Sequence, residues 1–346
     1  IAPEFLESAE VFVGSSAAIL SDNASNALVN IKEIKYNTSR PYTRLWYAQG
    51  DYDYVAADGV FSQNFAKNWN YTFGFRRIGN TGRFKGNQMD AWNVRSLLRW
   101  NTSPSTNFSL VHVFTNHGTQ ENGGVNRALS SKLGDNLSAV PMYNCFEDRV
   151  FRHDLTLSMT SLIAGDSSNI FSATAYFSHT ENERNYPEIV FAKQSDTIAR
   201  EFYTSRQAGA SAAWELSFRD VLGLRTGGEI YYTSLDKSFF TQEFRGLNLS
   251  AYALGQFRPL GNVEFTGGVR WMQRDNRTAV AFGAGSRINL SESVQFFADL
   301  SFSERLPSPA ENITLKKEAT SLALAEFAYV SQGYRFSVGG FARRVE

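Results

Sequence analysis

Residues 155–177 read LTLSMTSLIAGDSSNIFSATAYF, and this stretch decides the fold class. Apolar residues alternate with threonine and serine from Leu155 to Met159, and apolar residues alternate with polar ones again from Phe171 to Phe177. A period of two is the period of a β-strand with two different faces. Between the two segments lies Ala164-Gly165-Asp166-Ser167, a cluster of small turn-forming residues. The stretch therefore predicts an antiparallel hairpin.

The same alternation recurs along the chain from residue 70 onward. No stretch shows three capped turns of helical periodicity, apart from a short turn around 15–20. We expect about fourteen strands between Tyr42 and Glu346, arranged as one long antiparallel meander. The further alternating segments are 71–75, 108–114, 214–218, 224–232, 247–257, 263–271, 280–288, 294–302 and 334–338.

The connections between these segments are of two kinds, which alternate. The short ones are 66–68, 102–105, 164–167, 219–220, 258–261 and 291–293, and the long ones are 119–147, 180–195, 235–242 and 304–314. Such alternation is typical of outer-membrane barrels, which have short periplasmic turns and long external loops. With roughly 20–22 residues per strand and connection, against 9–11 needed to cross the bilayer, the strands should project beyond the membrane.

Composition excludes several classes of protein. The 346 residues carry 34 basic and 34 acidic side chains, so nothing suggests a nucleic-acid partner. The single cysteine, Cys145, excludes a disulfide scaffold and a cysteine-based metal site. Mean hydropathy is −0.31 and no apolar run approaches 18 residues, which excludes a membrane-spanning helix but not a barrel with two-faced strands. No nucleophile–base pair or convincing metal cluster stands out, so we expect no enzyme, cofactor or metal site.

Aromatic residues are abundant and support a membrane barrel. They make up 14% of the chain, as 28 Phe, 15 Tyr and 6 Trp. Several lie near the ends of segments, where aromatic girdles of barrels meet the membrane–water interface. Aromatic residues also favour strands in general, so this argument gains weight only together with the loop pattern. The girdle candidates are Trp46, Tyr47, Trp69, Trp92, Trp100, Trp214 and Trp271.

The first forty residues differ from the rest, and two segments resemble a known family. Residues 8–31 read SAEVFVGSSAAILSDNASNALVNI, and residues 301–311 read SFSERLPSPAE. The first resembles the end of the plug domain of TonB-dependent outer-membrane receptors, although Ala9, Asn23, Asn26 and Ala27 depart from that family's pattern. The second is similar to a segment in the barrels of those receptors. The matching positions are Glu10, Val11, Gly14, Asn30, Ile31, Arg305, Pro307 and Glu311.

The resemblance implies a domain organisation. Residues 1–40 would be the C-terminal end of a plug, and 41–346 an all-β, antiparallel transmembrane β-barrel. Barrels of this family have 22 strands around a plugged lumen. We therefore expect a fragment of a longer receptor whose barrel is incomplete at its C-terminus, and a naturally small barrel is the alternative.

The resemblance also implies a function. Such a receptor would lie in the bacterial outer membrane, in contact with its lipid, and would take up a scarce solute with energy from the TonB complex. The ligand would be a small molecule or metal chelate, such as a ferric siderophore, cobalamin or a glycan. A passive porin-like channel and a soluble all-β binding or adhesion protein are the alternatives.

Candidate site residues follow from position and charge. For external ligand contacts we expect Asn116, His117, Asn122, Tyr143 and Tyr186, in or beside long connections. Charged side chains on the lipid face cost about 2–4 kcal/mol at mid-membrane, so the arginines within strands should point into the lumen. Arg95, Arg99 and Arg270 are the leading cases; the others are Arg76, Arg77, Arg152, Arg225 and Arg274. His153 and His179 should lie on the lumen wall or at an interface.

Overall fold

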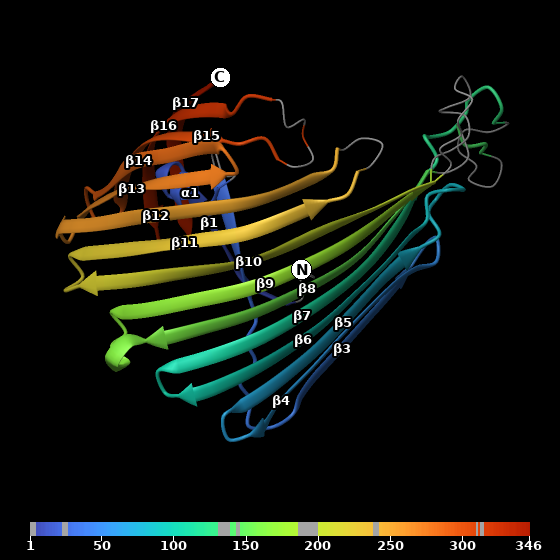
Figure 1. Cartoon of the computed structure of the whole chain (residues 1–346), viewed down its shortest axis with the longest axis horizontal. Helices are drawn as coiled ribbons and strands as arrows, with labels where there is room; N and C mark the ends of the chain where they lie inside the picture. The colour runs from blue at the N-terminus through green and yellow to red at the C-terminus, as the bar shows by residue number, and fades with distance from the viewer. Residues whose placement is uncertain are drawn as a thin grey trace.

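One antiparallel sheet dominates the protein. The computed structural model describes residues 5–22, 27–130, 139–142, 146–185, 200–237, 242–308, 311 and 315–346. Within these residues, fifteen strands pair in sequence order from β3 to β17 (Figure 1). Their bounds are β3 (Tyr42–Gly50), β4 (Tyr54–Ala66), β5 (Trp69–Asn80), β6 (Met89–Ser103), β7 (Thr106–Glu121), β8 (Phe146–Leu162), β9 (Asn169–Asn185), β10 (Arg200–Phe218), β11 (Leu222–Leu235), β12 (Phe244–Leu260), β13 (Val263–Arg274), β14 (Arg277–Asn289), β15 (Val294–Arg305), β16 (Glu318–Ser331) and β17 (Tyr334–Val345).

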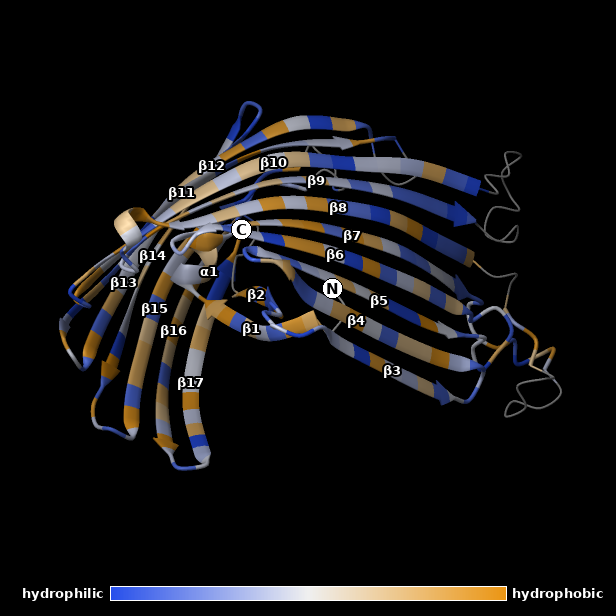
Figure 2. Cartoon of the chain, turned by 90° about the horizontal axis from the view of Figure 1, so that it is seen from below, coloured by the Kyte–Doolittle hydropathy of each residue, from blue (hydrophilic) through white to orange (hydrophobic). Residues whose placement is uncertain are grey.

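A small N-terminal unit lies against the concave side of this sheet. It consists of β1 (Leu6–Val13), helix α1 (Ser15–Leu20) and β2 (Ala27–Glu33), and β1 pairs with β2 alone. The large sheet curls into a deep trough around this unit (Figures 1 and 2). Among the described residues, no helix has the length and apolar character needed to cross a membrane.

The hairpin that decides the fold class is present. β8 and β9 pair with Leu155 opposite Phe177 and Met159 opposite Ala173. The 3₁₀ turn η2 (Ile163–Gly165) begins their connection, with Ala164 at φ 53° and Gly165 at φ 75°. The predicted all-β antiparallel meander is confirmed, and the described sheet has fifteen strands rather than about fourteen.

Long and short connections lie at opposite ends of the sheet. One end has only short connections, of two to six residues, from 67–68 to 332–333. The other end has every long connection, together with the tight turns at 51–53 and 275–276. β8, β9 and β10 have 17, 17 and 19 residues, well beyond the 9–11 that a bilayer requires.

Apolar side chains are exposed on the outer face of the sheet, and polar side chains are buried on its inner face. Leu45, Leu300 and Val338 are 74%, 66% and 76% exposed, whereas Asp58 and Asp299 are 1% and 3% exposed. Hydrophobic and hydrophilic residues alternate along the strands (Figure 2). Because successive residues of a strand point to opposite faces, the exposed apolar residues and the buried polar residues lie on opposite faces of the sheet. Apolar-out and polar-in alternation is the pattern of a barrel whose outer surface contacts lipid.

A row of aromatic rings crosses the convex face beside the short connections. Ring centroids of Phe65 and Trp69 lie 6.3 Å apart, those of Trp69 and Trp100 5.0 Å, and those of Trp100 and Phe108 5.9 Å. The four residues come from four consecutive strands, β4 to β7. Their place at the strand ends fits an interfacial girdle.

Candidate functional site

Helix α1 is built from small residues so that it can approach the wall of the trough closely. It begins after Gly14, whose φ of 61° falls in the left-handed region that favours glycine. Ser15, Ala17, Ala18 and Ile19 are all buried, and α1 contacts β13, β14 and β15. The helix therefore presents little side-chain bulk, which is what a close fit against a sheet requires.

The wall opposite α1 is correspondingly flat because glycines lie there. A Cβ atom at Gly283 would lie 2.6 Å from Cβ of Ser15, and one at Gly268 would lie 2.8 Å from Cδ1 of Ile19. At Gly283 a Cβ would therefore clash with α1 itself. At Gly268 it would also lie 2.4 Å from the Ala253 carbonyl oxygen, so glycine is needed there within the sheet as well as toward α1.

Polar contacts hold α1 to the wall on its other sides. The Asp299 carboxylate, 3% exposed, accepts hydrogen bonds from the Ser15 backbone N–H at 2.8 Å and the Ser15 hydroxyl at 2.5 Å. Arg270 donates to the Ile19 carbonyl at 3.2 Å. Tyr231 donates to the Asp22 carboxylate at 2.7 Å. These contacts, from β15, β13 and β11, form the first anchor of the N-terminal segment, which we define as residues 5–36.

A second anchor lies on the opposite wall, at β4 to β6. Arg95, itself buried, forms an ion pair with Glu33, and Arg99 donates a hydrogen bond to the Tyr36 carbonyl. Phe5 packs beside the Arg95 guanidinium, 5.7 Å from the ring centroid, and a Cβ at Gly74 would meet the same ring. The N-terminal segment thus crosses the trough and is fixed at both sides.

The matching residues of the plug resemblance lie in the β1–β2 ribbon. The Glu10 carboxylate accepts a hydrogen bond from the Asn30 side chain at 3.0 Å and pairs with Lys32. Val11 lies opposite Val29, and Ile31 lies opposite Ala9. Val11 is 64% and Ile31 is 44% exposed, so the ribbon has one open apolar face.

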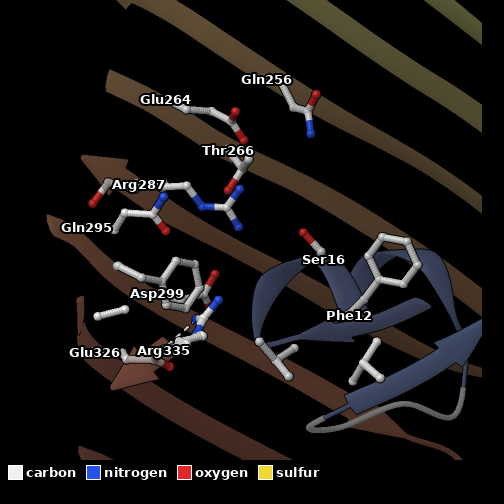
Figure 3. Close-up of a pocket in the computed structure, with 15 residues that line it drawn as sticks. Phe12, Ser16, Gln256, Glu264, Thr266, Arg287, Gln295, Asp299, Glu326 and Arg335 are labelled. Carbon is white, nitrogen blue, oxygen red and sulfur yellow. Dashed lines mark hydrogen bonds and ion pairs between the residues drawn. The ribbon is translucent and has the colours of Figure 1, made fainter. Parts of the chain in front are cut away.

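A polar cavity of 470 Å³ separates the N-terminal segment from the wall near the short-connection end (Figure 3). Phe12 and Ser16 border it on the segment side. Glu326 and Arg335, 3.1 Å apart, form an ion pair within it, and Glu264 pairs with Arg258 at 2.8 Å. The charged and polar wall residues are Gln256, Glu264, Thr266, Ser286, Arg287, Gln295, Asp299, Glu326 and Arg335.

The cavity is lined by charged and polar side chains of both charge signs, so it can accommodate a hydrated polar solute. Among the described residues, no cluster of His, Cys, Asp and Glu could hold a metal ion. Asp299 both lines the cavity and binds Ser15, so a shift of α1 would change the cavity directly.

The second motif forms a clasp in the long connection between β15 and β16. Arg305 contacts Glu311 at 3.0 Å and Glu318 at 3.4 Å, and the Ser308 N–H donates to Glu311 at 2.6 Å. Arg274 donates a hydrogen bond to the Pro307 carbonyl. The Arg305 and Ser308 hydrogen bonds lower the pKa of Glu311 from its ordinary 4.5 to about 2.

The residues expected to contact an external ligand do not gather in one site. Asn116 lines a convex-face cavity of 520 Å³ together with Asp90 and Arg149, and its neighbour His117 falls on the opposite face of β7. Asn122 is buried in a turn, where it donates to the Lys85 carbonyl at 2.7 Å and accepts from the Gly124 N–H at 2.9 Å. Tyr143 and Tyr186 lie outside the described residues.

The placement of Arg77 differs from expectation, and for His153 and His179 the structure excludes the lumen wall of the two positions expected. Arg77 lies on the convex face, not in the lumen, where its guanidinium covers the Trp92 ring at 4.9 Å and pairs with Asp90 at 3.2 Å. It sits near the long-connection end, where a charge can leave the apolar layer. His153 and His179 also lie on the convex face, opposite each other on β8 and β9. A charged residue is tolerated on the convex face if it lies near the end of its strand, so its position along the strand must be considered as well as its presence in a strand.

Sequence reasoning placed Arg270 in the lumen but missed the other residues of the first anchor. Asp299 lies between Ala298 and Leu300, so alternation alone puts it on the polar face with Ser301 and Ser303. Alternation therefore indicates that Asp299 faces the lumen. Nothing in the sequence indicates that it contacts Ser15, 284 positions earlier. Tyr231 and Glu264 also alternate with apolar residues on the outer face, but their contacts with Asp22 and Arg258 do not follow from that alternation.

Comparisons with known proteins support the fold. A family described as "Putative porin" matches residues 13–138, which is 126 of the 346 residues. No curated protein sequence matches the chain.

Solved structures match over nearly the whole chain. The ferric enterobactin receptor PfeA of Pseudomonas aeruginosa superposes with a TM-score of 0.77 at 15% identity, covering 99% of this chain and 58% of that structure. The FrpB iron transporter of Neisseria meningitidis gives 0.78 at 11%, covering 100% and 62%. The copper transporter OprC gives 0.78 at 13%, covering 100% and 60%. The chain thus spans about three-fifths of the length of these structures and shares their fold.

Proposed function

We propose that this chain is the C-terminal end of the plug and part of the barrel of a TonB-dependent outer-membrane receptor, which takes up a solute actively. The observation that carries the proposal is the N-terminal segment, fixed at both sides of the trough and bordered by a polar cavity. A single hydrogen bond contributes about 0.5–1.5 kcal/mol net, and one to a charged group about 1.5–3 kcal/mol. Such contacts hold the segment at rest and yield one by one to a pulling force.

The proposed solute is a metal chelate that enters from the long-connection end. Solved structures with the same fold include receptors and transporters for iron and copper species. Lumenal groups at that end can hold an anionic, aromatic or hydroxyl-rich chelate, for example Arg184, which lies over the Tyr203 ring at 5.4 Å. Cobalamin and a glycan are the other solutes that the plug and barrel resemblance permits.

A disulfide lock tests this function. Ser15→Cys with Asp299→Cys replaces a contact of 2.5 Å between the two side chains by a cross-link in the full-length protein. We expect uptake of a ferric chelate by energised cells to stop when the pair is oxidised and to return on reduction. Each single cysteine variant is the control.

A passive porin is the second candidate, favoured by the family match over residues 13–138. In a porin the N-terminal segment would stay in place during transport, so the oxidised lock would leave uptake unchanged. A protonophore separates the two functions as well, because it stops TonB-driven uptake and leaves passive diffusion intact. Uptake that survives both treatments would rule out the receptor.

A further inference from the structure

The convex face of the sheet is not smooth: it contains an apolar groove. Its cavity volume is 590 Å³, and it runs over β8 to β11. The floor is formed by alanine and glycine, and larger side chains from β7, β8 and β11 form its walls. The lining residues on this face are Phe108, Leu157, Met159, Ala173, Ala175, Ala210, Ala212, Gly228 and Ile230.

A polar rim closes the groove at the end that faces the long connections. On β10 the convex-face positions above Ala210 are Ala208 and then Arg206. Arg206 lies opposite His179 on β9 and donates a hydrogen bond to His179 Nδ1 at 3.3 Å. His153 lies opposite His179 in turn, and its Nδ1 is 3.2 Å from Nε2 of His112. Four strands thus contribute one polar row above the groove.

Within the described part of the chain, Arg206 has no direct contact with a carboxylate. The other convex-face arginines at this end contact carboxylates: Arg77 with Asp90, Arg149 with Glu147, Arg200 with Glu183 and Arg245 with Glu243. Among the described residues, Arg206 contacts only the imidazole of His179. The nearest carboxylate in the row, Glu181, is bonded to the other nitrogen of His179 at 3.1 Å. The Arg206 guanidinium therefore keeps N–H donors for an acceptor that the described residues do not provide.

The position of Arg206 along the membrane normal agrees with the expected depth of a lipid headgroup. Trp214 lies eight residues below it on the same face of β10, next to the short connections. Eight residues span about 26 Å along a strand, which is about 20 Å along the membrane normal at a typical strand tilt of about 40°. The apolar band of a barrel is about 25 Å tall. Arg206 thus lies near the outer boundary of the apolar layer, with the groove directly beneath it.

We propose that this groove and Arg206 bind one phosphate-bearing lipid of the outer leaflet. A phosphate oxygen accepts hydrogen bonds from the free N–H groups of Arg206, and an acyl chain fills the alanine-floored groove. Phosphate is the acceptor that best matches the planar guanidinium donors. The inference rests on the proposed placement in the outer membrane, but it concerns the outer wall and does not depend on solute uptake.

Native mass spectrometry of the full-length protein in neutral detergent tests the site. The probe is lipid A, which carries phosphate, and diacylglycerol is the comparison without phosphate. Arg206→Ala removes the headgroup contact, and Ala210→Phe fills the groove but leaves the rim intact. Arg245→Ala is the matched control, because it removes an exposed convex-face arginine of the same end that already has a carboxylate partner. Heat-modifiable migration on gels confirms that each variant is folded.

We expect Arg206→Ala and Ala210→Phe each to weaken lipid A binding about tenfold or more, with Arg245→Ala close to wild type. Equal binding by all variants would overturn the site, as would an equal loss in Arg245→Ala. Pyrophosphate, tested separately, distinguishes a soluble anion: binding that needs Arg206 and ignores Ala210→Phe would overturn the lipid assignment. If the proposed active uptake is wrong, the disulfide-lock experiment will show it. The lipid-binding measurements on Arg206→Ala and Ala210→Phe do not depend on that outcome.

Discussion

At the scale of single residues, Asp299 controls the first anchor, because one carboxylate accepts both hydrogen bonds of Ser15. Asp299→Asn keeps the shape but replaces one acceptor oxygen by a donor. The expected cost is about 1–3 kcal/mol, confined to the N-terminal segment. Hydrogen exchange of the amides of residues 15–20 should accelerate about tenfold, while exchange in β8 and β9 stays unchanged.

Asp154→Asn is the matched control for this prediction. Asp154 lies on the same concave face but pairs with Arg152, at 2.8 Å, away from the N-terminal segment. Equal acceleration of residues 15–20 in both variants would mean that Asp299 acts through the sheet as a whole and not through Ser15.

The ionisation of Glu311 should make the stability of the clasp between β15 and β16 depend on pH. Its pKa is lowered from 4.5 to about 2 by Arg305 and the Ser308 N–H. A lowered pKa means that the clasp stabilises the folded connection above pH 4.5, and that this stabilisation is lost as the pH falls from there to about 2. A spin label near the clasp should therefore stay ordered at pH 4 and become mobile only near pH 2. Glu311→Gln should be mobile at every pH; an ordered label in that variant would contradict the role of the carboxylate.

At the scale of elements, α1 is held by shape as much as by charge. Gly283→Ala would place a methyl group 2.6 Å from Cβ of Ser15 and 2.8 Å from the Leu300 carbonyl oxygen. Relief of the contact with Ser15 requires α1 to move, and relief of the contact with Leu300 requires a small shift between β14 and β15, so we expect a cost of about 1–3 kcal/mol. Limited proteolysis should then cleave the N-terminal segment faster than in wild type.

Gly255→Ala is the control for α1 docking. Gly255 also lies within a strand of the large sheet, but a Cβ there would meet only the Gly267 carbonyl oxygen, at an ordinary 3.7 Å. Proteolysis that increases equally in both variants would indicate general loss of sheet stability, and the specific contact with α1 would be disproved.

The elements also show what the sequence could and could not predict. Strict alternation with Ser, Thr or Asp on the inner face identified strands such as β9 and β15. β4 and β16 lacked a clear signal, since β4 alternates small residues around the buried Asp58, and β16 is apolar on both faces at 322–325. Residues of the strands could be assigned to the lumen from their alternation with apolar residues. Their partners in residues 5–36 could not, because alternation says nothing about contacts between distant segments.

At the scale of the whole molecule, the two anchors brace the trough from opposite sides. The first joins α1 to β13 and β15, and the second joins Glu33 and Tyr36 to β6. While either anchor holds, the released end stays close to its own binding site at a high effective concentration, so rebinding is favoured. Opening of the lumen should therefore depend on both anchors together, and not on the weaker one alone.

The double variant Asp299→Asn with Arg95→Met tests this cooperation. We expect the full-length protein in a planar bilayer to conduct rarely as wild type and as either single variant, and to open about tenfold more often when both anchors are removed, since two charge-assisted contacts are then lost. Arg152→Met, which changes a concave-face arginine outside both anchors, should behave as wild type. If one single variant already reached the open probability of the double variant, one anchor alone would close the lumen. Conductance that stayed at the wild-type level in the double variant would mean that the apolar contacts of Phe5 and Ile19 keep the N-terminal segment in place.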